Sequence, residues 1–422
     1  MPTFLETLRW RGLLYQTAGA DIDNHLATQG RVAYCGFDPT ASSLHVGNLI
    51  PVMGLMHLQR AGHRPFIVVG GGTGLIGDPS GKTAERQLHT METVEANSQA
   101  LRTQLGHFLD FTGETAAQMR NNADWLVPLG AVDFMRDVGK HFTVNYMLAK
   151  ESVQARIESG ISYTEFSYML LQAYDFRELF LREGVTLQVG GSDQWGNITA
   201  GLELIRRTTG GDAHALTFPL VATASGTKFG KTESGNVWLD PERTSPYQFY
   251  QFWINIDDRD VVRYLKYFTL LSRDEIEALK KEVEQDPAAR QAQQALAREV
   301  TTRVHGADAA HVAEDVSQLI FGKGDPASLS PEALVALSRE VPFVEMPAMS
   351  AVVDALVALK LAASKGAARR LIEQGGVSIN GRRVAGASDT LGEPLVGGYY
   401  LIKKGARDFG FLRTADNWPN PH

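Results

Sequence analysis

Two short groups of residues in this chain have the types and the spacing that would bind phosphate. His45-Val46-Gly47-Asn48 precedes an apolar segment, and Lys228-Phe229-Gly230-Lys231-Thr232 follows about 180 residues later. The start of a helix offers free N–H groups and the positive end of its dipole, and glycine lets a nucleotide approach the backbone. Two lysines and a hydroxyl add donors, as does the hydroxyl of Thr40. The pair predicts one phosphate site divided between two segments.

Each group taken alone also has an ordinary interpretation. A histidine at a helix start is more often a surface cap, and a lysine-rich loop is more often solvated. The same holds for Tyr34, which would otherwise be a core residue of a strand, and for Asp175, which would otherwise be a surface charge. Tyr168, Gln172 and Asp175, however, are spaced i, i+4 and i+7 and therefore share one helix face.

The elements that must position these residues alternate between strand and helix. A strand over 31–37, a helix from His45 to about Arg60 and a strand over 66–69 form one βαβ unit, which is typical of a doubly wound parallel sheet. The alternation resumes with a helix over 163–180, a strand over 185–189, a helix over 195–207 and a strand over 218–221, and a first helix is expected over 4–14. This predicts a Rossmann-like α/β domain over 1–220, interrupted by a helical insertion over 121–160.

The rest of the chain differs from this alternation. Residues 221–325 contain the lysine loop and then only helix-like segments, 326–350 resemble a linker, and 351–420 form a small module. An Asn380-Gly381 pair between two apolar runs predicts a hairpin there. From Asp354 onward there are 10 Lys and Arg against 6 Asp and Glu, whereas the remainder has 31 against 42. A small basic module behind an acidic body indicates a nucleic-acid contact, or chance surface composition.

Composition excludes several classes. Hydrophobic residues make up 44% and charged residues 21%, the usual balance of a globular protein, and no run of 18 apolar residues exists to span a membrane. The single cysteine, Cys35, rules out an internal disulfide and a multi-cysteine zinc site. The N-terminal residues lack the basic and apolar regions of a secretory signal, so a cytoplasmic location is expected.

The two phosphate groups, in this order and after a βαβ unit, resemble the class I aminoacyl-tRNA synthetases. In that class the two segments usually read HIGH and KMSKS. Here Asn48 stands in place of the last histidine and still offers a donor, while KFGKT keeps both lysines and the hydroxyl. Four longer segments are similar to the bacterial tyrosyl-tRNA synthetases: YCGFDPT from Tyr34, GLIGDP from Gly74, YMLLQAYD from Tyr168 and GGSDQWGN from Gly190. The resemblance extends over essentially the whole chain.

The resemblance implies a role for each matching residue. A tyrosine substrate would be held by Tyr34 and Asp175 at its phenol and by Asp78, Tyr168, Gln172 and Gln194 at its amino-acid end. ATP would contact Asp38, His45, Gly47, Asn48, Gly191, Asp193 and Lys231. The residues implied at the reacting phosphates and ribose are Thr40, His45, Asn48, Lys82, Arg86, Lys228, Lys231 and Thr232.

The implied reaction joins tyrosine to tRNA through an adenylate. Mg²⁺ is expected to accompany ATP, with no protein metal site. The tail resembles the S4 RNA-binding module, and its implied tRNA contacts are Lys365, Arg369, Arg370, Arg382 and Arg383. The insertion over 121–160 matches the dimer contact of the family, which implies a symmetric homodimer.

Two other hypotheses remain open at the level of sequence. One is a nucleotidyltransferase with a similar phosphate site, and the other is a non-enzymatic RNA-binding protein on a synthetase scaffold. The first does not account for Tyr34 and Asp175 or for the basic tail. The second would not need Asp78, Gln172 and both lysines of the loop.

Overall fold

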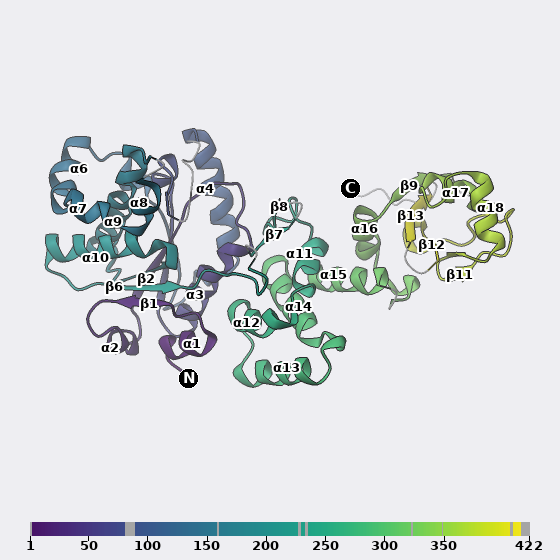
Figure 1. Cartoon of the computed structure of the whole chain (residues 1–422), viewed down its shortest axis with the longest axis horizontal. Helices are drawn as coiled ribbons and strands as arrows, with labels where there is room; N and C mark the ends of the chain where they lie inside the picture. The colour runs from purple at the N-terminus through teal and green to yellow at the C-terminus, as the bar shows by residue number, and fades with distance from the viewer. Residues whose placement is uncertain are drawn as a thin grey trace. The chain divides into compact units, whose positions relative to one another are not determined.

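A computed structural model describes the protein over residues 2–80, 89–157, 160–226, 229–232, 235–321, 324–347, 349–405 and 408–414 (Figure 1). The chain divides into two compact units. The first comprises 1–244 with 254–296, and the second comprises 245–253 with 297–422.

The first unit is built on a six-stranded sheet with the order β1-β6-β5-β2-β3-β4. All neighbouring pairs are parallel except β1 with β6. The chain passes from β2 to β3 on one side and returns to β5 on the other, so the sheet is doubly wound, as the sequence predicts. Its strands are β1 Gln16–Ala18, β2 Val32–Phe37, β3 Arg64–Val69, β4 Gln118–Asn121, β5 Leu187–Gly191 and β6 His214–Phe218.

Helices cover both faces of this sheet. Alternate residues of β2 and β3, such as Tyr34 and Phe66, face a buried cluster that includes Phe176 of α9 and Ile205 of α10. On the opposite face, Gly54 of α3 lies so close to the ring of Phe218 that a Cβ there would be 2.1 Å from it. The helices are α1 Phe4–Arg11, α2 Ile22–Ala27, α3 Leu49–Arg60, α4 Met91–Leu105, α9 Tyr163–Glu183 and α10 Trp195–Thr209.

The insertion is helical, as the sequence predicts. Its helices are α5 Ala123–Leu126, α6 Ala131–Asp137, α7 Val144–Leu148 and α8 Glu151–Ile157. Phe142, Met147 and Val153 pack on Met169 and Ala173 of α9. The insertion therefore has its core on the helix that also contains Tyr168 and Asp175.

The remainder of the first unit follows β6. A short pair, β7 Lys231–Thr232 and β8 Gly235–Asn236, belongs to the second phosphate segment, and α12 Asp258–Phe268 and α13 Arg273–Gln285 follow. Arg11, at the end of α1, donates to the carbonyls of Lys266, Thr269 and Leu271 over 2.6–2.8 Å. A buried arginine thus closes the C-terminal end of α12.

The second unit contains helices and a five-stranded sheet of order β11-β10-β12-β13-β9. Asn380 and Gly381 both have positive φ, 48° and 79°, and join β10 to β11 as the expected hairpin. The elements are α15 Ala307–Ile320, α16 Pro331–Glu340, β9 Phe343–Met346, α17 Val352–Ala358, α18 Lys365–Glu373, β10 Val377–Ile379, β11 Arg382–Arg383, β12 Tyr399–Lys404 and β13 Asp408–Thr414. Two further helices, α11 Pro246–Ile254 and α14 Gln291–His305, have residues in both units.

Three details differ from the sequence-based expectations. The first helix ends at Arg11 rather than Leu14, because Gly12 takes a left-handed conformation and closes it. The last strand of the first sheet is 214–218 rather than 218–221. The range 326–350 includes α16 and β9, since Ser330 accepts from Ala333 N and begins a helix at Pro331.

Candidate active site

The candidate site lies where the parallel strands end. Asp38 directly follows β2, and Gly191 ends β5. Thr73 lies in the loop that begins at Gly70, directly after β3. The carboxyl ends of β2 and β5 are the point at which the order of the sheet reverses, and ligands of doubly wound folds bind there.

One end of the site is a buried polar group around Asp175. Its carboxylate accepts from Asn122 Nδ2 at 2.9 Å and from Trp125 Nε1 at 2.7 Å. Burial raises the pKa of Asp175 to about 7, although both hydrogen bonds favour the ionised form. Asn122 also accepts from Gly72 N at 2.7 Å. Two neutral donors therefore hold this carboxyl group in place.

Tyr34 lies beside this carboxylate. Its ring packs edge-on against Phe176 at 5.3 Å and is 1% exposed, yet its hydroxyl is buried without a hydrogen-bond partner among the described residues. Burial, and next the charge of Asp175, raise the pKa of Tyr34 well above its usual value. A buried hydroxyl with no partner is costly, so the group is suited to a ligand that supplies the missing hydrogen bond.

The other end of the site gathers carboxylates. Asp38 accepts from Tyr168 Oη and from Thr73 Oγ1, both at 2.8 Å. Burial, followed by the charges of Asp38 and Asp78, raises the pKa of Tyr168 well above its usual value. A phenol so placed remains neutral and donates. The negative charge around it favours a cationic ligand such as an ammonium group.

Asp78 is held by Gln194, which lies between β5 and α10, by Asn197 of α10 and by the backbone of Ser80. It accepts from Gln194 Nε2 at 2.6 Å, from Asn197 Nδ2 at 3.3 Å and from Ser80 N at 2.9 Å. Gln172, on the face of α9 between Tyr168 and Asp175, is half-buried. Asp193 lies next to Gln194, which donates to it at 3.4 Å.

The two phosphate segments meet in space. His45 N donates to Asn48 Oδ1 and Gly47 N donates to His45 Nδ1, each at 3.0 Å, so the two side chains close the turn before α3. Val46 N donates to Val237 O, and Val237 N donates to Gly230 O, both at 3.0 Å. A Cβ on Gly230 would be 2.7 Å from Val46 and 3.7 Å from Gly47 N. A glycine is thus required where the second segment crosses the first.

This geometry also defines the state of the two polar side chains. Since His45 Nδ1 accepts from a backbone N–H, the ring proton lies on Nε2. Since Asn48 accepts through Oδ1, its amide Nδ2 is the donor that remains. Asn48 therefore accepts a backbone hydrogen bond through its oxygen and retains its amide nitrogen as a donor.

Some predicted site residues lie outside the described residues: Lys82, Arg86 and Lys228. The side chain of Thr232 is likewise outside them. Thr40 and Lys231 are exposed, on the turn after Asp38 and on β7 respectively.

Cys35 is buried on β2, between Tyr34 and Gly36, at 2% exposure. Burial, and next the charge of Asp193, raise the pKa of its thiol to about 12. The thiol is therefore protonated at neutral pH and is not a nucleophile. No group of three or more His, Cys, Asp or Glu that could hold a metal ion occurs in the described part of the chain.

The basic residues predicted to bind RNA lie in the second unit. Lys365, Arg369 and Arg370 are exposed on α18, and Arg382 and Arg383 are exposed on β11. Lys365 pairs with Asp354 at 2.6 Å. The guanidinium of Arg383 lies over Gly375, where any Cβ would clash with it at 1.3 Å.

Sequence reasoning missed four residues that complete the first unit's site: Thr73, Asn122, Trp125 and Asn197. Asn122 and Trp125 were included in the insertion, although they directly follow β4. The available signal was the polar Asn121-Asn122 pair at the end of a strand.

The doubly wound sheet, the site at the carboxyl ends of its strands and the crossing of the two predicted phosphate segments at Gly230 together indicate a class I synthetase. The family model for class I tRNA synthetases (W and Y) matches residues 28–322, and the model for the tyrosine--tRNA ligase SYY-like C-terminal domain matches 334–412. The chain is 54% identical to the tyrosine--tRNA ligase of Bacillus caldotenax over 97% of this chain and 99% of that one. It is 51% identical to tyrosine--tRNA ligase 1 of Bacillus subtilis over 98% and 100%.

Solved structures agree. A C-terminally truncated mitochondrial tyrosyl-tRNA synthetase of Aspergillus nidulans superposes with a TM-score of 0.69 at 31% identity, covering 76% of this chain and 95% of that one. A tyrosyl-tRNA synthetase of Archaeoglobus fulgidus, with a TM-score of 0.54 at 18% identity over 73% and 99%, shares the fold. The chain belongs to the tyrosine--tRNA ligase family and is an aminoacyl-tRNA synthetase.

No helix in the described part of the chain is both long and apolar enough to cross a membrane.

Proposed function

We propose that this chain activates L-tyrosine with ATP through the site described above and transfers it to tRNA(Tyr) in translation. One observation supports the placement of tyrosine above all others. The unpartnered hydroxyl of Tyr34 and the carboxylate of Asp175 lie together at one end, and the acidic group of Asp38, Asp78 and Tyr168 lies at the other. A phenol and an ammonium are the two ends of tyrosine.

The phenol of the substrate donates to the Asp175 carboxylate and accepts from the Tyr34 hydroxyl. Phenylalanine would occupy the same space and leave both groups unpaired, which costs binding energy. Asp78, Tyr168, Gln172 and Gln194 receive the amino-acid end. The match between the ligand and these buried groups gives selectivity for tyrosine.

Activation requires no general base. An oxygen of the tyrosine carboxylate attacks the α-phosphorus of ATP, the bond from that phosphorus to the bridging oxygen breaks, and pyrophosphate leaves with its electron pair. The nucleophile is already an anion, so the protein acts by positioning and by stabilising charge on the phosphoryl oxygens.

ATP would lie along the carboxyl ends of β2 and β5. We assign Asp38, Gly191 and Asp193 to the adenosine, and His45, Gly47 and Asn48 to the phosphates and ribose. Lys231 and Thr40, together with Lys82, Arg86, Lys228 and Thr232, would bind the leaving phosphates. Mg²⁺ carried by ATP would neutralise phosphate charge, and the protein would supply hydrogen-bond donors rather than a set of metal ligands.

In the second step a terminal ribose hydroxyl of tRNA attacks the carbonyl of the adenylate, and AMP leaves. We assign the segment 351–420 as the RNA-binding module, 326–350 as the link to it, and the helical part of 221–325 as the region that reaches the anticodon arm. Lys365, Arg369, Arg370, Arg382 and Arg383 would bind RNA phosphates, so salt should weaken tRNA binding.

We further propose a symmetric homodimer formed by the insertion. Val132, Met135 and Val144 are 76%, 60% and 61% exposed, and Tyr163 nearby in sequence is 72% exposed. Several large apolar side chains exposed within one short stretch of the chain are expected at an interface. Met135→Asp should convert the dimer to a monomer in analytical ultracentrifugation, whereas Met91→Asp, at 61% exposure outside the insertion, should not. We place the enzyme in the cytoplasm.

The test of the proposed function is pyrophosphate exchange into ATP. Exchange should depend on tyrosine and should fall at least about 100-fold in Lys231→Ala, with tyrosine affinity changed by less than about twofold. Exchange that depends on tryptophan, or no exchange, would overturn the substrate assignment. A loss of tyrosine affinity with an unchanged rate would overturn the role of Lys231.

A further inference from the structure

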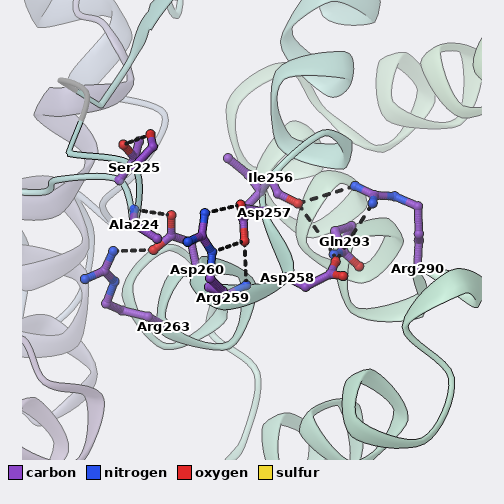
Figure 2. Close-up of polar contacts among 11 residues, drawn as sticks. Ala224, Ser225, Ile256, Asp257, Asp258, Arg259, Asp260, Arg263, Arg290 and Gln293 are labelled. Atoms are coloured by element: carbon purple, nitrogen blue, oxygen red, sulfur yellow. Dashed lines mark hydrogen bonds and ion pairs between the residues drawn. The ribbon is translucent and has the colours of Figure 1, made fainter.

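The segment that leads into the second phosphate group is fixed to α12 by a buried carboxylate. Asp260 is 3% exposed and accepts from Ala224 N at 2.7 Å through one oxygen and from Arg263 Nη2 at 2.5 Å through the other (Figure 2). Arg263 Nη2 also donates to Ala222 O at 2.7 Å. The carboxylate and the guanidinium thus hold two backbone groups, two residues apart, of one loop.

A second contact fixes the same loop beyond residues 227 and 228. Phe229 stacks on Phe268 with ring centroids 5.3 Å apart and meets Tyr264 edge-on at 5.1 Å. Tyr264 and Phe268 are both buried on α12. One helix therefore contacts the loop on both sides of Lys228, and Gly230 and Lys231 follow directly.

The N-terminal end of α12 and the residues that lead into it are held by further hydrogen bonds. Gln293 Nε2 donates to Asp258 Oδ1 at 2.5 Å, and Arg290 Nη2 donates to the carbonyls of Ile254 and Ile256 at 2.6 and 3.3 Å, as Figure 2 shows for Ile256. Arg11 closes the opposite end. A loop attached to a braced helix is held in one place.

We propose that Asp260 is a positioning residue for adenylate formation. It acts through the loop: by fixing Ala224 and Arg263 it sets Gly230 against Val46 and places Lys231 at the phosphate site. This inference rests on the proposed role of Lys231. Helix α12, which lies outside the sheet, would thus contribute to the reaction through Asp260, a residue that does not contact the substrate.

The chain offers a matched control at the start of the same helix. Asp257 is the N-cap of α12, accepts from Arg259 N at 2.9 Å and pairs with the Arg259 guanidinium at 2.8 Å. It makes the same kinds of bonds as Asp260 and none to residues 222–232 that the structure records. Asp257→Ala therefore perturbs α12 without releasing the loop.

The experiment measures the rate of tyrosyl-adenylate formation at saturating substrates, the tyrosine dissociation constant and the unfolding midpoint. Asp260→Ala should lower the rate about tenfold, the value of one charge-assisted hydrogen bond, and leave tyrosine affinity within about twofold. Asp260→Asn, which keeps an acceptor for Ala224 N, should recover part of the rate. Asp257→Ala should keep the wild-type rate, even if its unfolding midpoint falls as far as that of Asp260→Ala.

A double-mutant cycle separates positioning from a general structural effect. If Asp260 acts through Lys231, the double variant Asp260→Ala with Lys231→Ala should be no slower than Lys231→Ala alone. The inference would be overturned if the two substitutions lowered the rate independently, so that their fold-losses multiplied in the double variant. An equal loss of rate in Asp257→Ala would also overturn it. An unchanged rate in Lys231→Ala alone would instead contradict the role of Lys231 in the proposed function. This result differs from those that contradict the positioning role of Asp260, so the two can be told apart.

Discussion

Removing the hydroxyl of Tyr34 should change stability and binding in opposite directions. The hydroxyl is buried and has no hydrogen-bond partner in the described structure, whereas its ring is well packed against Phe176. An unsatisfied buried hydroxyl costs about 1–3 kcal/mol. Tyr34→Phe keeps the ring, so the free energy of unfolding without substrate should rise by about 1 kcal/mol or more.

The same substitution should weaken tyrosine binding, because the substrate phenol loses a donor. One neutral hydrogen bond contributes about 0.5–1.5 kcal/mol, which corresponds to a rise of roughly 2- to 12-fold in the tyrosine dissociation constant. Phenylalanine, which never makes this bond, should bind at least as well as it does to the unchanged enzyme. Denaturant unfolding followed by circular dichroism and titration calorimetry measure the two effects on one preparation.

Tyr400→Phe is the matched control for stability. Its hydroxyl donates to Gly392 O at 3.1 Å, so its removal should lower the free energy of unfolding by about 0.5–1.5 kcal/mol. If Tyr34→Phe destabilises the substrate-free protein as Tyr400→Phe does, the Tyr34 hydroxyl already has a hydrogen-bond partner and is not open to a ligand in the pocket.

Three further outcomes follow from the buried groups. Burial raises the pKa of Asp175 to about 7, and the proposed function has the substrate phenol bind its ionised form. Tyrosine affinity should therefore fall as pH drops below about 7, and Asp175→Asn should remove this dependence in pH-resolved titrations. Burial lowers the pKa of His57 to about 3; the unfolded chain therefore binds this proton first, and the stability that the neutral ring contributes above pH 6.5 should be lost progressively toward pH 3. His57→Leu should flatten that part of the unfolding curve. Arg11→Leu leaves three carbonyls at the end of α12 without their donor and should lower the unfolding free energy by roughly 3 kcal/mol in denaturant titrations.

The parts of the fold that could be predicted are those with a strong local pattern. Residues 32–37 form a fully apolar strand, and the helix over 163–183 has Tyr168 and Asp175 on one face, so both elements follow from spacing alone. The hairpin at Asn380-Gly381 follows from two residues that tolerate positive φ. The edge strands were harder, since β4 is only Gln118–Asn121 and is half-buried along its length.

The candidate site was predictable only in part. The approach of Gly230 to Val46 joins residues 184 positions apart, and no local pattern encodes it. Asn122 and Trp125 were missed because their role is to orient Asp175, 50 or more residues away in sequence, rather than to form a motif of their own. The attachment of the loop to Asp260 is likewise visible only in three dimensions.

The burial of Cys35 makes this enzyme a convenient object for spectroscopy. It is the one cysteine of the chain, it is 2% exposed, and at a pKa of about 12 only about one thiol in ten thousand is a thiolate near pH 8. Maleimide probes should therefore not react with it. Cysteines introduced at Ser225 on the loop and at an exposed residue such as Val396 can receive a fluorophore pair in an otherwise native background. The distance between the loop before β7 and the C-terminal domain then becomes measurable in solution during turnover.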